Sequence, residues 1–307
     1  MCIRDRVRFA DPKDPKNFEK LTDEKTRAYY GESCPNPSLR IFPIKEVADI
    51  GRKHGVPLII DNTAAPVICR PLEHGAAVVM HSLTKYIGGH GTTIGGIIVD
   101  GGNFDWAANP KKQPLFNEPD PSYNGAIWGR DVPKMTGANV AFAIRARVVL
   151  LRDLGAPLSP FNAFQIIQGL ETVAIRMKQH CANAEKVVKF LETQKKVKNV
   201  IYPTNHQGEI RDRAKRYMKG GYGSLVGMDL GSLEAGSKFI NNLKLLYHVA
   251  NIGDARSLAI HPASTTHGQL NEKQLAEAGV TPGYVRLSIG IEHPDDIIAD
   301  IEQALAA

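Results

Sequence analysis

The sequence predicts an α/β fold in which a parallel or mixed sheet is covered by helices and is followed by a smaller α+β region. Three short apolar runs are continuous rather than alternating, which indicates strands buried on both faces. Amphipathic helical patterns lie before and after these runs. A length of 307 residues with 43% hydrophobic content is enough to bury a large core.

The first half of the chain contains one clear helix, the three strands and a long loop. The helix spans residues 43–54, begins with Pro43 and is followed by Gly55 at the expected stop position. Residues 103–133 are rich in Asn, Pro and Gly, and we expect them to form a functional or interface loop. The strands are expected at residues 56–60, 76–80 and 94–99.

The second half begins with two long helical patterns, 138–154 and 160–194, which are separated by Gly155-Ala156-Pro157. This break is the predicted domain boundary, with a major domain over residues 1–155 and a smaller C-terminal domain over residues 156–307. Strands and helices then alternate to the end of the chain. The strands are expected at 199–202, 224–230 and 285–291, and the helices at 211–219, 233–242 and 294–306.

The charge balance argues against a nucleic-acid partner. The chain has 38 Lys and Arg residues against 32 Asp and Glu residues, a net charge of +6. Its basic stretches are not interleaved with the aromatic residues or glycines that nucleic-acid binding would use. We therefore expect these lysines to be solvated surface residues.

Cysteine spacing and hydropathy favour the cytoplasm. The cysteines lie far apart, so neither a zinc knuckle nor a disulfide framework is indicated, and a reducing compartment fits best. The first twenty residues are charged where a signal peptide would be apolar, and no apolar run is long enough to span a bilayer. We expect no metal site and no membrane partner. The four cysteines are Cys2, Cys34, Cys69 and Cys181.

Two strand ends place an acid and a lysine at the same edge of the predicted sheet. Asp61 ends one apolar run, and Lys85 follows the next. Pyridoxal phosphate needs an amine whose pKa can be lowered, an anion beside its pyridine nitrogen and hydroxyl donors for its phosphate. Asp61, Lys85, Ser82 and Thr84 supply such a set. The spacing alone leaves two alternatives open, a helix cap at Asp61 and a chance Ser-x-Thr-Lys string.

Three other candidate sites are weaker. His261 and His267 lack a suitably spaced cysteine or acidic partner, so we expect structural hydrogen bonding rather than metal binding. Cys34 and Cys69 are interpreted as small buried thiols. The glycine loop at residues 88–91 is not followed by Lys-Ser/Thr, which argues against a nucleotide P-loop.

Seven strings occur in order along nearly all of the chain after residue 6. They are ESCPNP at 32–37, DNT at 61–63, SLTKYIGGHG at 82–91, SPFNAF at 159–164, GLET at 169–172, HPASTTH at 261–267 and RLSIGIE at 286–292. Together they resemble the Cys/Met-metabolism family of pyridoxal-phosphate enzymes, which has the aspartate aminotransferase type of fold, fold type I. Two further strings, EPDPSY at 118–123 and NIGDARSL at 251–258, are most similar to the O-acetylhomoserine sulfhydrylases of that family.

The resemblance implies a role for each residue of the cofactor site. Lys85 would bond covalently to pyridoxal phosphate and then move protons. Asp61 would pair with the pyridine nitrogen, and Ser82 and Thr84 would hold the phosphate. Asn36 would lie near the cofactor's ring hydroxyl and the substrate carboxylate.

The resemblance also implies the substrate contacts. Arg286 would clamp the substrate carboxylate, a task for which a guanidinium fork is well suited; a surface salt bridge at Arg286 remains the alternative. Asn251 would also contact substrate, and relatives that handle cystathionine usually carry a serine there.

The implied reaction is a γ-replacement that converts O-acetylhomoserine and sulfide to homocysteine and acetate. The implied full-length form is a homo-oligomer, a tetramer. Three alternatives stay open: a cystathionine γ-synthase, a methionine or cystathionine γ-lyase, and a non-catalytic fragment. Family members continue upstream of Val7, and residues 1–6 do not resemble them, so we expect an N-terminally truncated cofactor domain.

Overall fold

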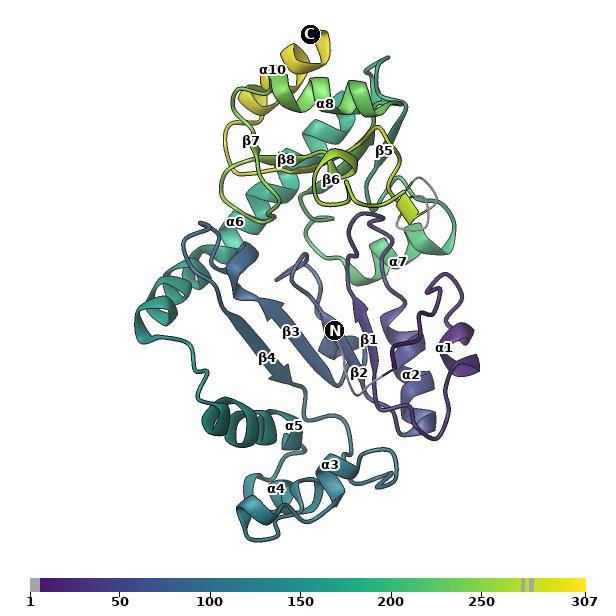
Figure 1. Cartoon of the computed structure of the whole chain (residues 1–307), viewed down its shortest axis with the longest axis vertical. Helices are drawn as coiled ribbons and strands as arrows, with labels where there is room; N and C mark the ends of the chain where they lie inside the picture. The colour runs from purple at the N-terminus through teal and green to yellow at the C-terminus, as the bar shows by residue number, and fades with distance from the viewer. Residues whose placement is uncertain (1–5, 272–273, 276–278) are drawn as a thin grey trace.

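The computed structural model describes residues 6–271, 274–275 and 279–307 and contains two sheets connected by one long helix. That helix, α6 (Pro160–Glu192), starts beside the first sheet and ends against the second. Figure 1 shows the first sheet in the middle of the molecule and the second sheet above it, beneath α8 and α10. The strand ends that were expected to carry chemistry therefore lie between the two sheets.

The first sheet has the order β1-β2-β3-β4, in which the first three strands are parallel and β4 is antiparallel to β3. It confirms the expected mixed sheet. Its register places Glu32 opposite Asp61 at the carboxyl ends of β1 and β2, and Ser82 ends β3. The strands are β1 (Tyr29–Glu32), β2 (Leu58–Asp61), β3 (Val78–Ser82) and β4 (Gly96–Asp100).

The predicted helix at residues 43–54 is confirmed as α2 (Ile44–His54), with Pro43 as its N-cap. Gly55 ends it at φ 65°, a left-handed conformation that favours glycine. The buried face carries Ile44, Val47 and Ala48, and α2 contacts β2 and the short α1 (Lys16–Lys20). The spacing of the apolar residues and the glycine after the last turn therefore located this helix correctly.

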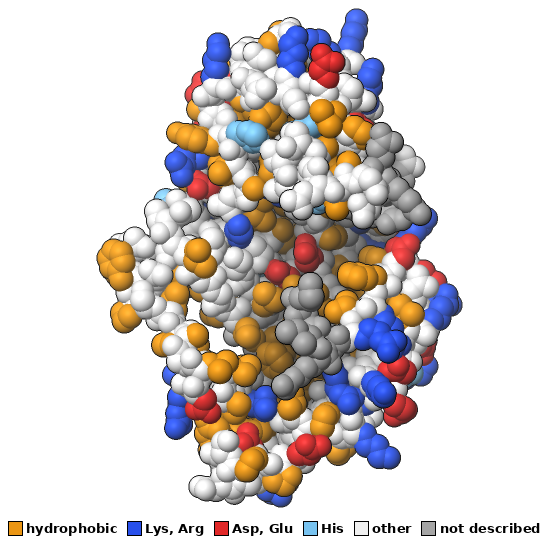
Figure 2. Space-filling view, viewed as in Figure 1, with side chains coloured by type: hydrophobic (Ala, Val, Ile, Leu, Met, Phe, Trp, Pro, Cys, Tyr) orange, Lys and Arg blue, Asp and Glu red, His pale blue; other side chains and the backbone are white. Residues whose placement is uncertain are grey.

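The expectation that the third apolar run is buried on both faces is wrong. β4 is an edge strand paired only with β3 among the described strands, and Ile97 and Ile98 are 45% and 48% exposed. Apolar side chains are also exposed on the first half of α6, and Figure 2 shows hydrophobic surface on this side of the molecule. A continuous apolar run reveals strand propensity, but which faces are covered depends on distant segments.

The region expected to be a loop at residues 103–133 is partly helical, which corrects that prediction. Its aromatic side chains join Ala77 and Val78 of the first sheet region in a separate hydrophobic core. Trp106 stacks on Phe142, which lies beyond this region, with ring centroids 5.3 Å apart. Helices of only 3 to 9 residues give too little periodicity to be recognised among prolines and glycines. The helices are α3 (Pro114–Asn117), η3 (Pro121–Tyr123) and α4 (Trp128–Thr136), followed by α5 (Ala141–Arg145) and η4 (Ala146–Arg152).

The second sheet has the order β5-β6-β9-β8-β7 and is mostly antiparallel. The expected strands and helices of this half are present, with ends shifted by a few residues. The very short strands β7 and β8 were not predicted. The strands are β5 (Asn199–Ile201), β6 (Leu225–Asp229), β7 (Tyr247–His248), β8 (Leu258–Ile260) and β9 (Tyr284–Ser288), and the helices are α7 (Glu209–Tyr217), α8 (Leu233–Asn242) and α10 (Pro294–Ala306).

The long helix α6 takes part in both large hydrophobic cores. Its residues Val173 and Met177 belong to the core of the first sheet, and Val187 and Leu191 belong to the core of the second. The domain boundary between residues 155 and 156 stays a prediction. The helix that follows it packs in the cores of both sheets.

Candidate active site

Lys85 lies at the carboxyl edge of the first sheet, in the π-helical turn η2 (Leu83–Ile87) that follows β3. Its Nζ donates a hydrogen bond to Oδ1 of Asn251, in the segment between β7 and β8 of the second sheet. Burial lowers the pKa of the Lys85 amine, and the nearby positive charge of Arg286 lowers it further. A lysine with a lowered pKa can act as a nucleophile and as a proton carrier near neutral pH.

Arg286 lies on β9 and faces the same segment. Its Nη2 donates to the backbone carbonyl of Asn251 at 3.1 Å, while its Nε is buried without a partner among the described residues. Burial lowers the pKa of this guanidinium. Asn251 thus contacts Lys85 through its side chain and Arg286 through its backbone. An unused donor on a buried guanidinium is suited to an anionic ligand.

Asp61 lies at the carboxyl end of β2 on the same edge. Its Oδ1 accepts a hydrogen bond from the backbone N–H of Thr63 at 2.8 Å, and Oδ2 accepts one from the hydroxyl of Tyr30 at 3.3 Å. Thr63 Oγ1 in turn accepts a hydrogen bond from the backbone N–H of Ser82 at 2.8 Å. Asp61 and Ser82 are therefore connected through Thr63. Asp61 thereby stabilises a turn after its strand, and no described helix begins there for it to cap.

The negative charge of Asp61 affects its neighbours. Burial raises the pKa of Glu32, and the charge of Asp61 adds to that increase. Burial likewise raises the pKa of Tyr30 to about 12, with contributions from Asp61 and Glu32. His81, the residue before Ser82, has a buried Nδ1 without a partner among the described residues, and burial lowers its pKa. A cationic nitrogen heterocycle would be favoured at such an acidic edge.

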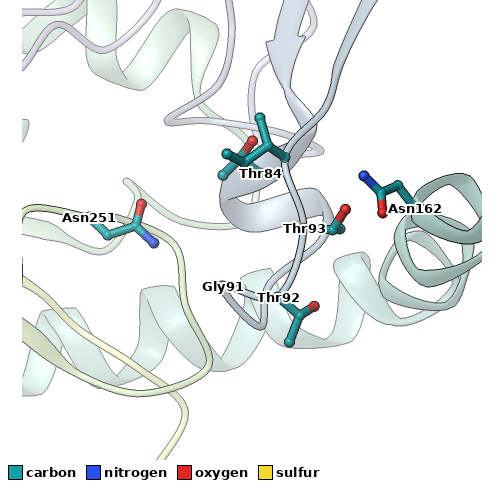
Figure 3. A pocket seen from close by; sticks show the side chains of 7 residues that line it. Thr84, Gly91, Thr92, Thr93, Asn162 and Asn251 are labelled. Atoms are coloured by element: carbon teal, nitrogen blue, oxygen red, sulfur yellow. The ribbon is translucent and has the colours of Figure 1, made fainter. Parts of the chain in front are cut away.

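A cavity of about 410 Å³ lies beside the Lys85 turn. Figure 3 shows Thr84 above it, Asn251 entering from the second half of the chain and Asn162 from the first turns of α6. Thr84 Oγ1 accepts a hydrogen bond from the backbone N–H of Gly95 at 3.1 Å. The lining residues are Thr84, Gly91, Thr92, Thr93, Ile94, Asn162 and Asn251.

Thr92, Thr93 and Asn162 line the cavity but are not among the predicted site residues. Asn162 lies within one of the strings that carry the family resemblance, which was the available signal. Thr92 and Thr93 directly follow the glycine loop after Lys85, but a threonine pair in a loop has no distinctive pattern. Only the fold shows that these three residues share a cavity.

Among the predicted site residues, Thr84 and Asn251 line this cavity, and Lys85, Asp61, Ser82, Arg286 and Asn36 do not. Asn36 follows β1 along the chain, four residues after Glu32. Its backbone hydrogen-bonds to the carboxylate of Glu32, which lowers the pKa of that group against the larger effect of burial. Asn36 therefore lies near Glu32, which is opposite Asp61 at the sheet edge. Its role stays a prediction.

The weaker candidates have structural contacts. His261 Nδ1 is hydrogen-bonded to Ser264 Oγ at 2.8 Å, and its Nε2 is bonded to the carbonyl of Pro282 at 2.7 Å, so both ring nitrogens are occupied. Cys34 and Cys69 are buried, and burial raises the pKa of each thiol to about 12. Cys2 lies outside the described residues.

Across the part of the chain that the structure describes, no helix combines the length and the apolar character needed to cross a bilayer.

The groups at this edge fit pyridoxal phosphate by their chemistry. An amine of lowered pKa, a carboxylate at a neighbouring strand end and the hydroxyl of Thr84 at the cavity correspond to the cofactor's aldehyde, ring nitrogen and phosphate. The Nε of Arg286, which has no partner among the described residues, is a donor suited to an anionic group. The hydroxyl of Ser82 lies at the end of β3, next to the Lys85 turn.

The chain is similar to proteins named as sulfhydrylases and to one named as a homocysteine/cysteine synthase. It is 50% identical to the O-acetyl-L-homoserine sulfhydrylase of Leptospira meyeri, over 98% of this chain and 69% of that protein. It is 45% identical to the O-acetyl-L-homoserine sulfhydrylase 1 of Thermus thermophilus, over 98% of this chain and 70% of that protein. It is 41% identical to the homocysteine/cysteine synthase of Saccharomyces cerevisiae, over 97% of this chain and 69% of that protein.

A solved structure has the same fold. It is a putative O-acetylhomoserine (thiol)-lyase from Campylobacter jejuni, which carries N'-pyridoxyl-lysine-5'-monophosphate. It matches with a TM-score of 0.89 and 39% identity, over 97% of this chain and 70% of that one. The expected α/β architecture of the pyridoxal-phosphate enzymes is thereby confirmed. Residues 3–306 also match the family described as Cys/Met metabolism PLP-dependent enzyme. The chain belongs to this family of pyridoxal-phosphate-dependent enzymes.

Proposed function

We propose that this chain carries the reaction centre of an O-acetylhomoserine sulfhydrylase, which converts O-acetylhomoserine and sulfide to homocysteine and acetate. The observation that carries the proposal is the arrangement of Lys85 and Arg286 on either side of Asn251. In this arrangement Lys85 would carry protons and Arg286 would bind the substrate carboxylate. The relatives named for this activity support the choice of substrate.

The cofactor-binding residues would hold pyridoxal phosphate and polarise its ring. Pyridoxal phosphate, when bound, supplies the electron sink that makes the Cα proton of an amino acid acidic. The Asp61 carboxylate would keep the ring nitrogen protonated, and the hydroxyls of Ser82 and Thr84 would bind the phosphate. Asn36 would lie toward the ring hydroxyl.

The substrate residues would set the geometry of proton transfer. Arg286 would bind the α-carboxylate through its fork and thereby orient Cα toward Lys85. The Lys85 amine would remove the Cα proton, release it, and then remove a proton from Cβ, after which acetate leaves Cγ and sulfide bonds to the same carbon. Lys85 would then return protons to Cβ and Cα, which completes homocysteine. Asn251 would hold the amine on the substrate side between these steps. The lowered pKa of Lys85 leaves more of its free base available than an ordinary lysine would have.

Three finer statements belong to the same proposal. We propose the cytoplasm as the compartment, because the buried free thiols Cys34, Cys69 and Cys181 suit a reducing environment. The protein is proposed to form a homo-oligomer, a tetramer, with no nucleic-acid or membrane partner. Residues 1–155 and 156–307 are proposed as the major and smaller domains.

Cofactor binding tests the first part of the proposal. Purified protein mixed with pyridoxal phosphate should develop a band at about 420 nm that persists on dialysis. Lys85→Ala should abolish this band, whereas Lys45→Ala, which changes an exposed lysine on α2, should not. If the unmodified chain forms no persistent band, it acts as a non-catalytic fragment.

Substrate assays test the second part. Homocysteine should form from O-acetylhomoserine with sulfide faster than cystathionine forms with cysteine. A preference for cysteine would indicate a cystathionine γ-synthase, and release of a keto acid without a thiol would indicate a γ-lyase. Comparing acetyl, succinyl and phospho esters of homoserine would establish the leaving group.

A further inference from the structure

The guanidinium of Arg176 is buried where α6 meets the segment that follows Lys85. Arg176 is 6% exposed. Its Nη1 donates to the carbonyl of Tyr86 at 2.6 Å, and its Nη2 donates to the carbonyls of Ile87 at 3.0 Å and Gly169 at 2.7 Å. One side chain therefore connects α6 to the two residues directly after the reactive lysine.

All hydrogen bonds that Arg176 makes within the described residues go to neutral oxygens. The fourth acceptor is Thr172 Oγ1, which lies 3.2 Å from Nε. Burying a guanidinium without a carboxylate is unfavourable, and burial lowers the pKa of Arg176 accordingly. Carbonyls at the end of a helical turn lack partners within the turn, and Arg176 supplies donors for two of them, at Tyr86 and Ile87.

The contact between α6 and this segment leaves no room for side-chain atoms. A Cβ added at Gly169 would lie 2.5 Å from the carbonyl oxygen of Ile87. A Cβ at Gly89, whose φ is 74°, would lie 2.6 Å from Cζ of Arg176. The backbone N–H of Gly89 donates to the carbonyl of Lys85 at 2.7 Å, which closes the turn that carries the lysine. The turn is thus seated directly on α6.

The same helix also holds the strand that carries Arg286. His180 Nδ1 is hydrogen-bonded to the carbonyl of Ile289 at 2.7 Å, and Asn183 Nδ2 donates to the carbonyl of Gly290 at 3.1 Å. Both carbonyls lie just after β9. Burial lowers the pKa of His180 to about 4, so His180 is neutral near neutral pH and adds no second charge beside Arg176.

We propose that Arg176 is a positioning residue for Lys85, which seats the turn at residues 83–88 on α6 and so directs the amine toward Asn251 and Arg286. This inference rests on the proposed function only in taking Lys85 as the reactive amine. Arg176 touches neither the cavity nor the amine, so its effect would be transmitted through the backbone of the turn.

Hydrogen exchange in the cofactor-free protein tests whether Arg176 holds the turn at residues 83–88 against α6. In Arg176→Lys a single ammonium replaces the planar fork and cannot serve all of its carbonyl acceptors. We expect amide exchange of the peptide 83–91 to become about tenfold faster, the consequence of losing a charge-assisted hydrogen bond. Arg213→Lys is the matched control, because Arg213 is 3% exposed on α7 and binds two carbonyls, of Pro12 and Lys13, away from Lys85.

The pH profile of Lys85 distinguishes positioning from a general loss of stability. Labelling by an amine-reactive ester, followed by mass spectrometry, gives the pKa of this lysine without cofactor. In the unmodified protein it should lie below the ordinary lysine value of about 10.4, and in Arg176→Lys it should rise toward that value as the amine reaches solvent. Thr172→Val removes the acceptor of Nε, together with the hydroxyl's own hydrogen bond to the carbonyl of Gly169 at 3.3 Å, and should give a smaller change in the same direction.

The outcomes separate this inference from the proposed function. If the labelling profile and the exchange of 83–91 in Arg176→Lys match those of the unmodified chain, Arg176 does not position Lys85. The inference also fails if Arg213→Lys changes the Lys85 profile equally. Should Arg176→Lys not fold, an unchanged Lys85 profile in Thr172→Val would overturn the inference. Absence of a pyridoxal-phosphate band in the unmodified chain would contradict the proposed function alone, because both readouts are made without cofactor.

Discussion

Lys85 donates its hydrogen bond to the side chain of Asn251, a residue 166 positions further along the chain. The amine comes from the first sheet and the amide from a segment of the second. Because a neutral oxygen accepts the bond, the amine keeps a lowered pKa even though it is hydrogen-bonded. The junction between the sheets is therefore also the point at which the reactivity of the lysine is set.

Asn251→Asp should raise the pKa of Lys85, since a carboxylate next to an ammonium favours the charged form. The fraction of free amine at neutral pH would fall, and kcat/KM should fall by about tenfold or more. The rate should recover at higher pH, because the ascending limb of the pH–rate profile, which follows deprotonation of Lys85, shifts to higher pH. A pH–rate profile checks this, and an unchanged limb would contradict the link between Asn251 and the amine.

Arg286→Lys should weaken substrate binding while keeping the local charge. An ammonium lacks the bidentate fork, so we expect kcat/KM to fall about 100-fold, mostly through KM. The pKa of Lys85 should stay low in this variant, whereas Arg286→Met should raise it, because the positive charge that lowers it is gone. Steady-state kinetics and amine labelling give the two quantities, and equal Lys85 profiles in both variants would contradict the electrostatic effect.

Asp61→Asn should lower the pKa of Tyr30, which burial and the charges of Asp61 and Glu32 raise to about 12. Removing one of these negative charges makes the phenolate less unfavourable. Ultraviolet difference titration of the cofactor-free protein checks this, with Tyr30→Phe identifying the signal. The same variant should bind pyridoxal phosphate more weakly, and a Tyr30 transition that does not move would place Asp61 too far away to matter.

Gly169→Ala should destabilise the protein although alanine is the better helix former. The Cβ would collide with the carbonyl of Ile87, and we expect a loss of about 2 kcal/mol in the free energy of unfolding. Urea denaturation checks the magnitude, with the exposed neighbour Gln168→Ala as a control that should change stability by less than about 0.5 kcal/mol. A stabilising Gly169→Ala would contradict the close approach of α6 to the Lys85 turn.

The sequence predicted well those features that a single segment determines. The helix α2 and the helix α10 (Pro294–Ala306) were located by their prolines and apolar faces, and both are present. Lys85 and Asp61 were found because each follows an apolar run at the sheet edge. The edge position of β4 could not be predicted, since burial of a strand depends on neighbours distant in sequence.

The contacts between the two sheets could not be predicted for a similar reason. Asn251 was predicted as a site residue only from the family resemblance. Nothing in its own segment indicates that Lys85 lies beside it. Arg176 follows a recognised string on α6, yet an arginine on a helix usually points to solvent. Only the packing of α6 against residues 86–88 shows that its guanidinium is buried.

The 33 residues of α6 give the site a strict dependence on helical phase. A helix turns about 100° per residue, so inserting one residue between Arg176 and His180 would rotate every later contact away from its partner. His180 and Asn183 would then face away from the carbonyls after β9, while Arg176 still held the Lys85 turn. Loops that carry none of the site residues can change length and leave the amine and the guanidinium in place, whereas this segment of α6 cannot.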